Sequence, residues 1–201
     1  MTSTLDHRTT LAGTRWRTVD IITTAVIAVA CGVVFWAWSL LANVLGAAFT
    51  AFPPAGGLIV GMWLLAGPLA ALVVRRPGAA LFAETVAGTV EALLGNQWGL
   101  SNVWYGLVQG AAAELAFLVF AYRRWGLPTV LLAAALTGAA SALMDSLFYY
   151  PTWSLGWKLT YLVIVVASGV VIAGVGSWYL VRALARTGVL APFASGRSPR
   201  A

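Results

Sequence analysis

The sequence predicts an all-α membrane protein, a bundle of six transmembrane helices with both the N- and the C-terminus in the cytoplasm. Of its 201 residues, 61% are apolar and only 9% are charged, whereas a soluble domain carries about 25% charged residues. Residues 21–74 contain no ionisable side chain other than Cys31, and one membrane crossing takes roughly 20 helical residues. That segment therefore holds two spans and the turn between them.

Six apolar segments alternate with short turns along the chain. The turns contain proline, glycine or paired arginines, which interrupt regular helices, and they lie at residues 52–54, 75–78, 95–99, 123–128 and 150–151. The helices are expected, in order, at residues 20–41, 56–74, 78–94, 101–122, 128–149 and 159–181.

The basic residues fall almost entirely on one side of this bundle. That side carries eleven arginines: Arg8, Arg15, Arg17, Arg75, Arg76, Arg123, Arg124, Arg182, Arg186, Arg197 and Arg200. The other side carries only Lys158. Because positive charge accumulates in cytoplasmic loops, we expect a multi-pass protein of the plasma membrane. Residues 1–18 form a cytoplasmic segment, residues 19–182 the membrane domain, and residues 183–201 a disordered cytoplasmic tail.

Several functional classes are not supported by the sequence. The net charge of +6 does not indicate nucleic-acid binding, because the arginines flank apolar runs as membrane topology requires. His7 is the only histidine and lies outside every expected span, so metal hydrolases and histidine-dependent serine proteases lack their key residues. Lys158 follows no glycine-rich phosphate loop. We expect a transport protein without a cofactor or a metal; an acid-dependent membrane enzyme stays an alternative.

Four acidic residues lie inside apolar spans: Glu84, Glu91, Glu114 and Asp145. A charged side chain at the bilayer centre costs roughly 3 kcal/mol or more, so each is a candidate functional residue. Two structural alternatives stay open: Asp145 could pair with Lys158, and Glu114 could join two helices. Glu91 is the hardest to explain structurally, because no basic residue is expected near it.

Polar and aromatic side chains accompany these acids at the outer ends of the helices. Asn102, Tyr105 and Gln109 follow an i, i+3, i+7 spacing, which places them on one helix face. The aromatic residues of the outer turns could form an interfacial belt, but acids without basic partners beside tryptophans also suit a cationic aromatic ligand. The candidate substrate-binding residues are Glu84, Glu91, Trp98, Asn102, Tyr105, Gln109, Asp145 and Trp153.

Four segments carry a family resemblance: Trp16-Arg17-Thr18-Val19-Asp20, Phe-Pro-Pro-Ala-Gly-Gly at 52–57, Arg-Pro-Gly-Ala-Ala-Leu-Phe-Ala-Glu at 76–84, and Gly-Asn-Gln-Trp-Gly at 95–99. Residues 15–182 resemble the substrate-binding S-components of energy-coupling factor (ECF) vitamin transporters. Within this family, the resemblance is to the branch associated with thiamin and its hydroxymethylpyrimidine precursor.

The resemblance implies a mechanism. Such a subunit captures a vitamin at the outer face under a lid between the first two helices, here residues 43–57. It then docks on a transmembrane coupling subunit and topples in the bilayer, driven by two ATPase subunits. Many S-components carry an Ala-x-x-x-Ala pattern on the first helix for docking. This chain instead offers Ala25, Ala28 and Gly32, which could equally serve helix packing.

A second hypothesis is a secondary transporter for small organic cations, coupled to protons or sodium through Glu84 or Glu114. Such transporters are often built from inverted repeats, and no repeat is visible in this sequence.

Overall fold

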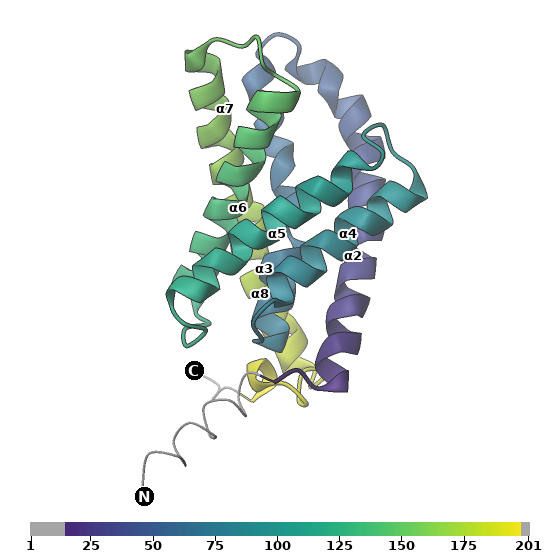
Figure 1. Cartoon of the computed structure of the whole chain (residues 1–201), viewed down its shortest axis with the longest axis vertical. Helices are drawn as coiled ribbons and strands as arrows, with labels where there is room; N and C mark the ends of the chain where they lie inside the picture. Colours follow the sequence, from purple (N-terminus) through teal and green to yellow (C-terminus); the bar gives the residue numbers. More distant parts are fainter. Residues whose placement is uncertain (1–14, 198–201) are drawn as a thin grey trace, which may run out of the picture.

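Residues 15–197 are described by a computed structural model, and within that range the chain forms helices and turns (Figure 1). The helices build six rods, so the predicted all-α fold with six helices is confirmed. In chain order the rods are α2 (Thr18–Leu45) with η1 (Gly46–Phe49), η2 (Pro53–Leu64) with α3 (Ala66–Val74), α4 (Ala79–Leu94), α5 (Ser101–Val119), α6 (Leu127–Phe148), and α7 (Leu155–Ser168) with η3 (Gly169–Val175) and α8 (Gly176–Arg186). A short turn, η4 (Ala194–Gly196), follows.

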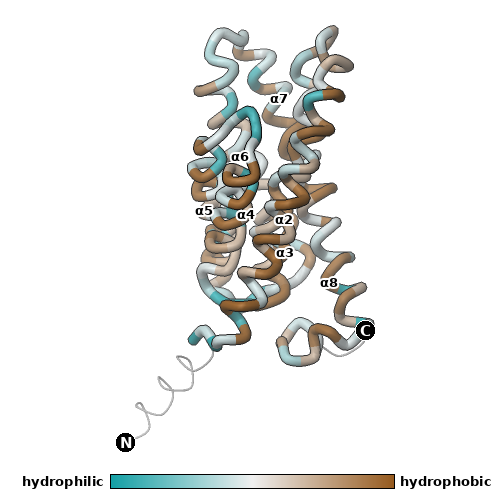
Figure 2. Tube along the Cα trace, turned by 90° about the vertical axis from the view of Figure 1, so that its right-hand side faces the viewer, coloured by the Kyte–Doolittle hydropathy of each residue, from teal (hydrophilic) through white to brown (hydrophobic). Residues whose placement is uncertain are grey.

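Four of the six rods are long and apolar enough to cross a membrane: Thr18–Phe49, Pro53–Val74, Leu127–Phe148 and Leu155–Arg186. The other two, α4 and α5, run obliquely across the bundle (Figure 1). Hydrophobic positions dominate α2 and α3 (Figure 2). Because side chains such as Val26 and Val44 on α2 are 62% and 73% exposed, the outer surface of this helix suits contact with lipid.

The second rod changes its helix type midway. Pro53 and Pro54 open η2, a 3₁₀-helix of 12 residues, although such helices usually end after 3–4 residues. After Leu65 the rod continues as α3, whose nine residues are all buried. The half of the rod that begins at Pro53 is therefore a tightly wound 3₁₀-helix, and the half that ends at Val74 is part of the core.

Glycines let α4 and α5 approach each other closely. A Cβ atom on Gly106 would lie 2.6 Å from the carbonyl oxygen of Glu84, and one on Gly88 would lie 2.5 Å from that of Asn102. A Cβ atom on Gly110 would likewise lie 2.9 Å from the Cα atom of Leu81. Small residues permit such backbone contact between membrane helices. The crossing sets the acids of α4 beside the polar face of α5.

The two described ends of the chain lie at the same end of the bundle (Figure 1). We call it the basic end, because the described arginines gather there: Arg15, Arg17, Arg75, Arg76, Arg123, Arg124, Arg182, Arg186 and Arg197. Asp20 is fully buried at this end and forms ion pairs with Arg17 at 2.7 Å and Arg76 at 2.9 Å. These contacts join the start of α2 to the turn before α4.

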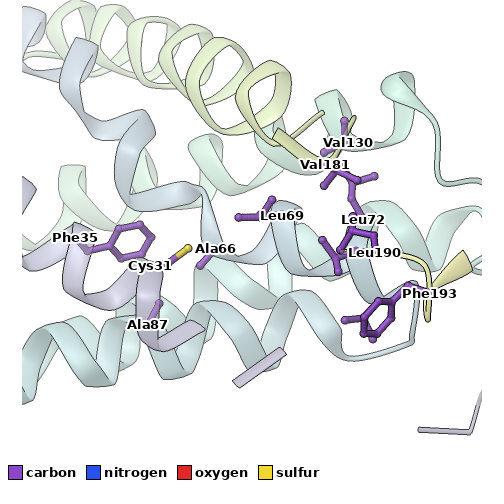
Figure 3. Close-up of a cluster of buried hydrophobic side chains, with 12 residues drawn as sticks. Cys31, Phe35, Ala66, Leu69, Leu72, Ala87, Val130, Val181, Leu190 and Phe193 are labelled. Carbon is purple, nitrogen blue, oxygen red and sulfur yellow. The ribbon is translucent and has the colours of Figure 1, made fainter. Parts of the chain in front are cut away.

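The start of the tail folds back onto the basic end, which differs from the disordered tail expected from residue 183. Leu190 and Phe193 belong to the core cluster around Leu72 and Val130 (Figure 3). The Ser195 hydroxyl donates to the Val73 carbonyl at 2.8 Å. Burial of these two apolar side chains holds the segment against the bundle, although most residues of the segment are not large and apolar. Residues 1–14 and 198–201 of the expected cytoplasmic segments lie outside the described residues.

The connection between the first two rods is more helical than the expected lid. Of residues 43–57, the first three complete α2, Gly46–Phe49 form η1, and η2 begins at Pro53. Only residues 50–52 lie outside a helix. This connection is thus mostly helical rather than an open loop.

The topology generates the first testable prediction. Cysteines placed at Arg75 or Arg123 should resist a membrane-impermeant thiol reagent in intact cells, because positive charge keeps this side in the cytoplasm. Cysteines at Asn96 or Thr152 should react. Cys31 is only 6% exposed, so it should add no background labelling. The opposite labelling pattern would reverse the orientation.

A second prediction concerns the crossing of α4 and α5. Gly106→Ala should lower the melting temperature in detergent by several degrees, because overpacking against a rigid backbone costs about 1–3 kcal/mol. Gly176→Ala is the matched control, since a Cβ there meets nothing within 4 Å. Equal melting temperatures for the Gly106 variant and the wild type would show that the close approach is not needed.

Candidate functional site

A cavity of about 620 Å³ opens between the rods at the end opposite the basic end. Its walls come from α2, η2, α4, α5, α6 and α7, and Phe49 and Thr50 cover it from the connection after α2. The eight candidate residues all line it: Glu84, Glu91, Trp98, Asn102, Tyr105, Gln109, Asp145 and Trp153. Sequence spacing linked only some of them, whereas the fold brings all eight to one cavity.

Glu91 lies on one wall, where three elements meet. Its Oε1 atom accepts a hydrogen bond from the Ser39 hydroxyl on α2 and another, at 3.1 Å, from the Trp63 indole on η2. The residue is only 3% exposed. Its carboxylate is therefore buried and held by neutral donors.

Asp145 lies on the opposite wall, on α6. Its two oxygens accept hydrogen bonds from the phenols of Tyr105, at 2.7 Å, and Tyr161, at 2.8 Å. Lys158 does not pair with it, because the Lys158 ammonium donates instead to the Pro151 carbonyl at 3.0 Å. The structure therefore does not contain the ion pair between Asp145 and Lys158 that the sequence left open.

The inner end of the cavity is formed by Glu84 and Gln109. Glu84 accepts a hydrogen bond from the Gly67 backbone at the start of α3, and its Oε1 atom is buried without a partner. The Gln109 amide donates to the Ser141 hydroxyl at 3.0 Å. One carboxylate oxygen is thus left available deep in the site.

Aromatic rings line the space between the acids. Trp63 stands edge-on to Trp98 with ring centroids 5.6 Å apart. On the other wall, Tyr150 stacks on Trp153 at 3.9 Å, and Trp153 meets Tyr161 edge-on at 5.7 Å. These rings differ from exposed aromatic residues at the same end of the bundle, such as Trp104 at 67% exposure, which suit an interfacial belt.

The cavity contains carboxyl groups but no basic side chain. Three carboxylates line it, and no lysine, arginine or histidine is among the described lining residues. Nor do residues 15–197 bring three or more His, Cys, Asp or Glu side chains together as a metal site. Acids facing aromatic rings in a concave site can bind an organic cation, because the rings present a negative face and the carboxylates balance the charge.

Glu114 has a different role from the other membrane acids. It accepts hydrogen bonds from the backbone nitrogens of Gly78 at 2.6 Å, Ala80 at 3.0 Å and Leu81 at 3.3 Å. These are unpaired donors at the start of α4. Glu114 is therefore a cap supplied by α5, in line with the alternative that it joins two helices.

The three residues expected to dock on a coupling subunit have unequal surroundings. Ala28 is fully buried against Ala70 and Ala83, and a Cβ on Gly32 would collide with Val90 and the Ala87 carbonyl of α4. Both face the interior, which differs from the expected docking role. Ala25 is partly exposed. The spacing of small residues did not reveal which side of the helix faces outward.

Sequence reasoning missed Ser39, Trp63, Ser141 and Tyr161. Ser141 could have been found, because it lies four residues before Asp145 and so shares its helix face. The other three lie in helices that carry none of the eight candidate residues, so nothing on their own helix pointed to them.

Three comparisons with known proteins found relatives of this chain. The family model of the permease component of ABC-type cobalt transport systems matches residues 19–140. A Bacillus subtilis protein named as an HMP/thiamine permease, YkoE, is 37% identical over 184 residues, which cover 90% of this chain and 91% of that protein. A crystal structure of an S-component of an ECF transporter superposes with a TM-score of 0.86 at 36% identity, covering 91% of this chain and 92% of the other.

Proposed function

Because the chain belongs to the S-components of ECF transporters, in the branch of the HMP/thiamine permeases, we propose that its cavity binds thiamin or a related pyrimidine at the outer face of the plasma membrane. The protein is a multi-pass membrane protein and a transport subunit, not an enzyme. As an S-component it takes a small vitamin as substrate and works with the partner subunits of an ECF transporter.

The observation that carries the proposal is a set of acids and aromatic rings without a base. Thiamin combines a positively charged thiazolium ring with an aminopyrimidine. A carboxylate in a water-poor site gains most from a cation that replaces its lost hydration. Aromatic faces add cation–π attraction and stacking. A phosphate group, in contrast, would meet three carboxylates and no counter-charge.

The proposed contacts follow from the positions of the side chains. Glu91 makes the main electrostatic contact with the cation, Asp145 adds negative charge from the other wall, and Glu84 does so from the inner end. Trp98 offers a ring face, helped by Tyr105 or Trp153. Asn102 and Gln109 bond the pyrimidine edge; since Gln109 donates to Ser141, its amide oxygen can accept from the amino group.

Delivery to the cytoplasm depends on the partner subunits. We propose that the loaded protein docks on a transmembrane coupling subunit and that two ATPase subunits drive the release of the vitamin. The outward face of α2 is suited to docking, because Val26, Ala30, Val33 and Ala37 are exposed and lie three or four residues apart. We therefore propose that this face, rather than Ala28 and Gly32, contacts the coupling subunit.

The third prediction tests the charge of Glu91. Glu91→Gln keeps the shape and an acceptor oxygen but removes the charge. Thiamin affinity should fall by on the order of 100-fold, whereas hydroxymethylpyrimidine, which is neutral, should change by less than about threefold. Isothermal titration with both ligands measures the two losses.

Glu114→Gln is the matched control for this experiment. It removes the same charge from a partly buried carboxylate outside the cavity, so it should lower stability without changing the preference between the ligands. Equal losses for both ligands in Glu91→Gln would assign Glu91 a structural role instead.

The fourth prediction tests energy coupling. The purified protein should bind thiamin without ATP, and liposomes that contain it alone should not accumulate the vitamin. Accumulation driven by a proton or sodium gradient, without partner subunits, would favour the secondary transporter.

A further inference from the structure

Ser39 is a membrane-helix hydroxyl that bonds to a side chain of another helix. It is 1% exposed on α2 and does not line the cavity. Its hydroxyl donates to Glu91 Oε1, and it accepts from the Trp63 indole nitrogen at 3.2 Å. Ser39 therefore contacts two side chains that line the cavity, Glu91 and Trp63, although it does not line the cavity itself.

Ser141 and Ser168 also make hydrogen bonds to other elements, but most threonine hydroxyls of the bundle bond within their own helix. The hydroxyls of five threonines each donate to the carbonyl four residues earlier: Thr24, Thr85, Thr89, Thr137 and Thr160. This local bond satisfies a hydroxyl in an apolar helix without any tertiary contact. Phe35 lies four residues before Ser39 on the same helix, yet the Ser39 hydroxyl donates to Glu91 rather than to the Phe35 carbonyl.

The contact fixes one half of the Glu91 carboxylate. Oε1 receives both the Ser39 hydroxyl and, at 3.1 Å, the Trp63 indole. With Oε1 held from α2 and η2, the carboxylate cannot rotate freely, so the direction of its other oxygen is fixed as well. The same bonds orient the Trp63 ring, which meets Trp38 edge-on at 6.5 Å and Trp98 at 5.6 Å.

We propose that Ser39 is a positioning residue that holds the Glu91 carboxylate and the Trp63 indole in the orientation that selects a cationic ring over a neutral one. The inference rests on the proposed function, because it assigns Glu91 to the cationic part of the ligand. It adds that the selectivity depends on a buried hydroxyl that never touches the ligand. Pre-orienting a charged group lowers the cost of ordering it on binding.

The experiment is a double-mutant cycle with thiamin and hydroxymethylpyrimidine as probes. Ser39→Ala should weaken thiamin binding about tenfold and hydroxymethylpyrimidine binding less than about threefold. In the Glu91→Gln background, the same change should weaken thiamin binding less than about twofold, because the group that Ser39 positions has lost its charge. Thr24→Ala, which removes a buried hydroxyl from the same helix, should leave both affinities unchanged.

Additive effects in the cycle, or equal losses for both ligands, would overturn the positioning role. If Ser39→Ala does not fold, Trp63→Phe tests the same Glu91 oxygen, because it removes the other donor and keeps an aromatic ring. Trp63→Phe should reproduce the selective loss of thiamin binding and the non-additivity with Glu91→Gln. An equal loss for both ligands overturns the positioning role. If Glu91→Gln is selective and Ser39→Ala is not, this inference fails alone. If the wild type binds neither probe, the proposed function fails and the inference with it.

Discussion

A carboxylate inside a membrane domain needs hydrogen-bond donors from the protein, because the hydrocarbon supplies none. Each acid among the described residues receives at least one donor from another part of the chain, although Glu84 Oε1 receives none. Asp20 bonds the turn before α4, and Glu84 bonds the start of α3. Glu114 bonds the start of α4, while Asp145 joins α6 to α5 and α7. With Glu91 joining α2, η2 and α4, the acids form the polar connections of the bundle.

These connections depend on how closely the rods approach. The glycines between α4 and α5 bring two backbones into contact, so that short side chains span the remaining distance. Gly57 and Gly61 serve the same purpose between η2 and the sixth rod, where the Gly61 nitrogen donates to the Ser168 hydroxyl at 3.0 Å. The cavity opens at the end away from the arginines, and Gly88 and Gly106 of the α4–α5 contact are among the residues that line it.

The acids divide into two groups by what surrounds them. Glu114 and Asp20 receive donors at helix starts or from arginines, which satisfy them within the fold. Glu84, Glu91 and Asp145 face the cavity and receive neutral donors only. No described lysine or arginine at the cavity wall is available to pair with these carboxyl groups. A cationic ligand supplies what these three residues lack, which links the architecture to the proposed transport of a thiamin-like vitamin.

The sequence by itself determined the membrane class, the number of helices, their approximate ends and the group of acids and aromatic residues near one end. Hydropathy, turn residues and charge are properties of a local segment, so they can be read along the chain. Only the tertiary structure decided that Glu114 caps α4 while Glu91 faces the cavity, that Asp145 pairs with two tyrosines rather than Lys158, and that Ala28 and Gly32 face inward. It alone placed Ser39 and Trp63 beside Glu91. These features depend on how each helix is rotated about its axis and which helix packs against it, and sequence spacing within one helix fixes neither.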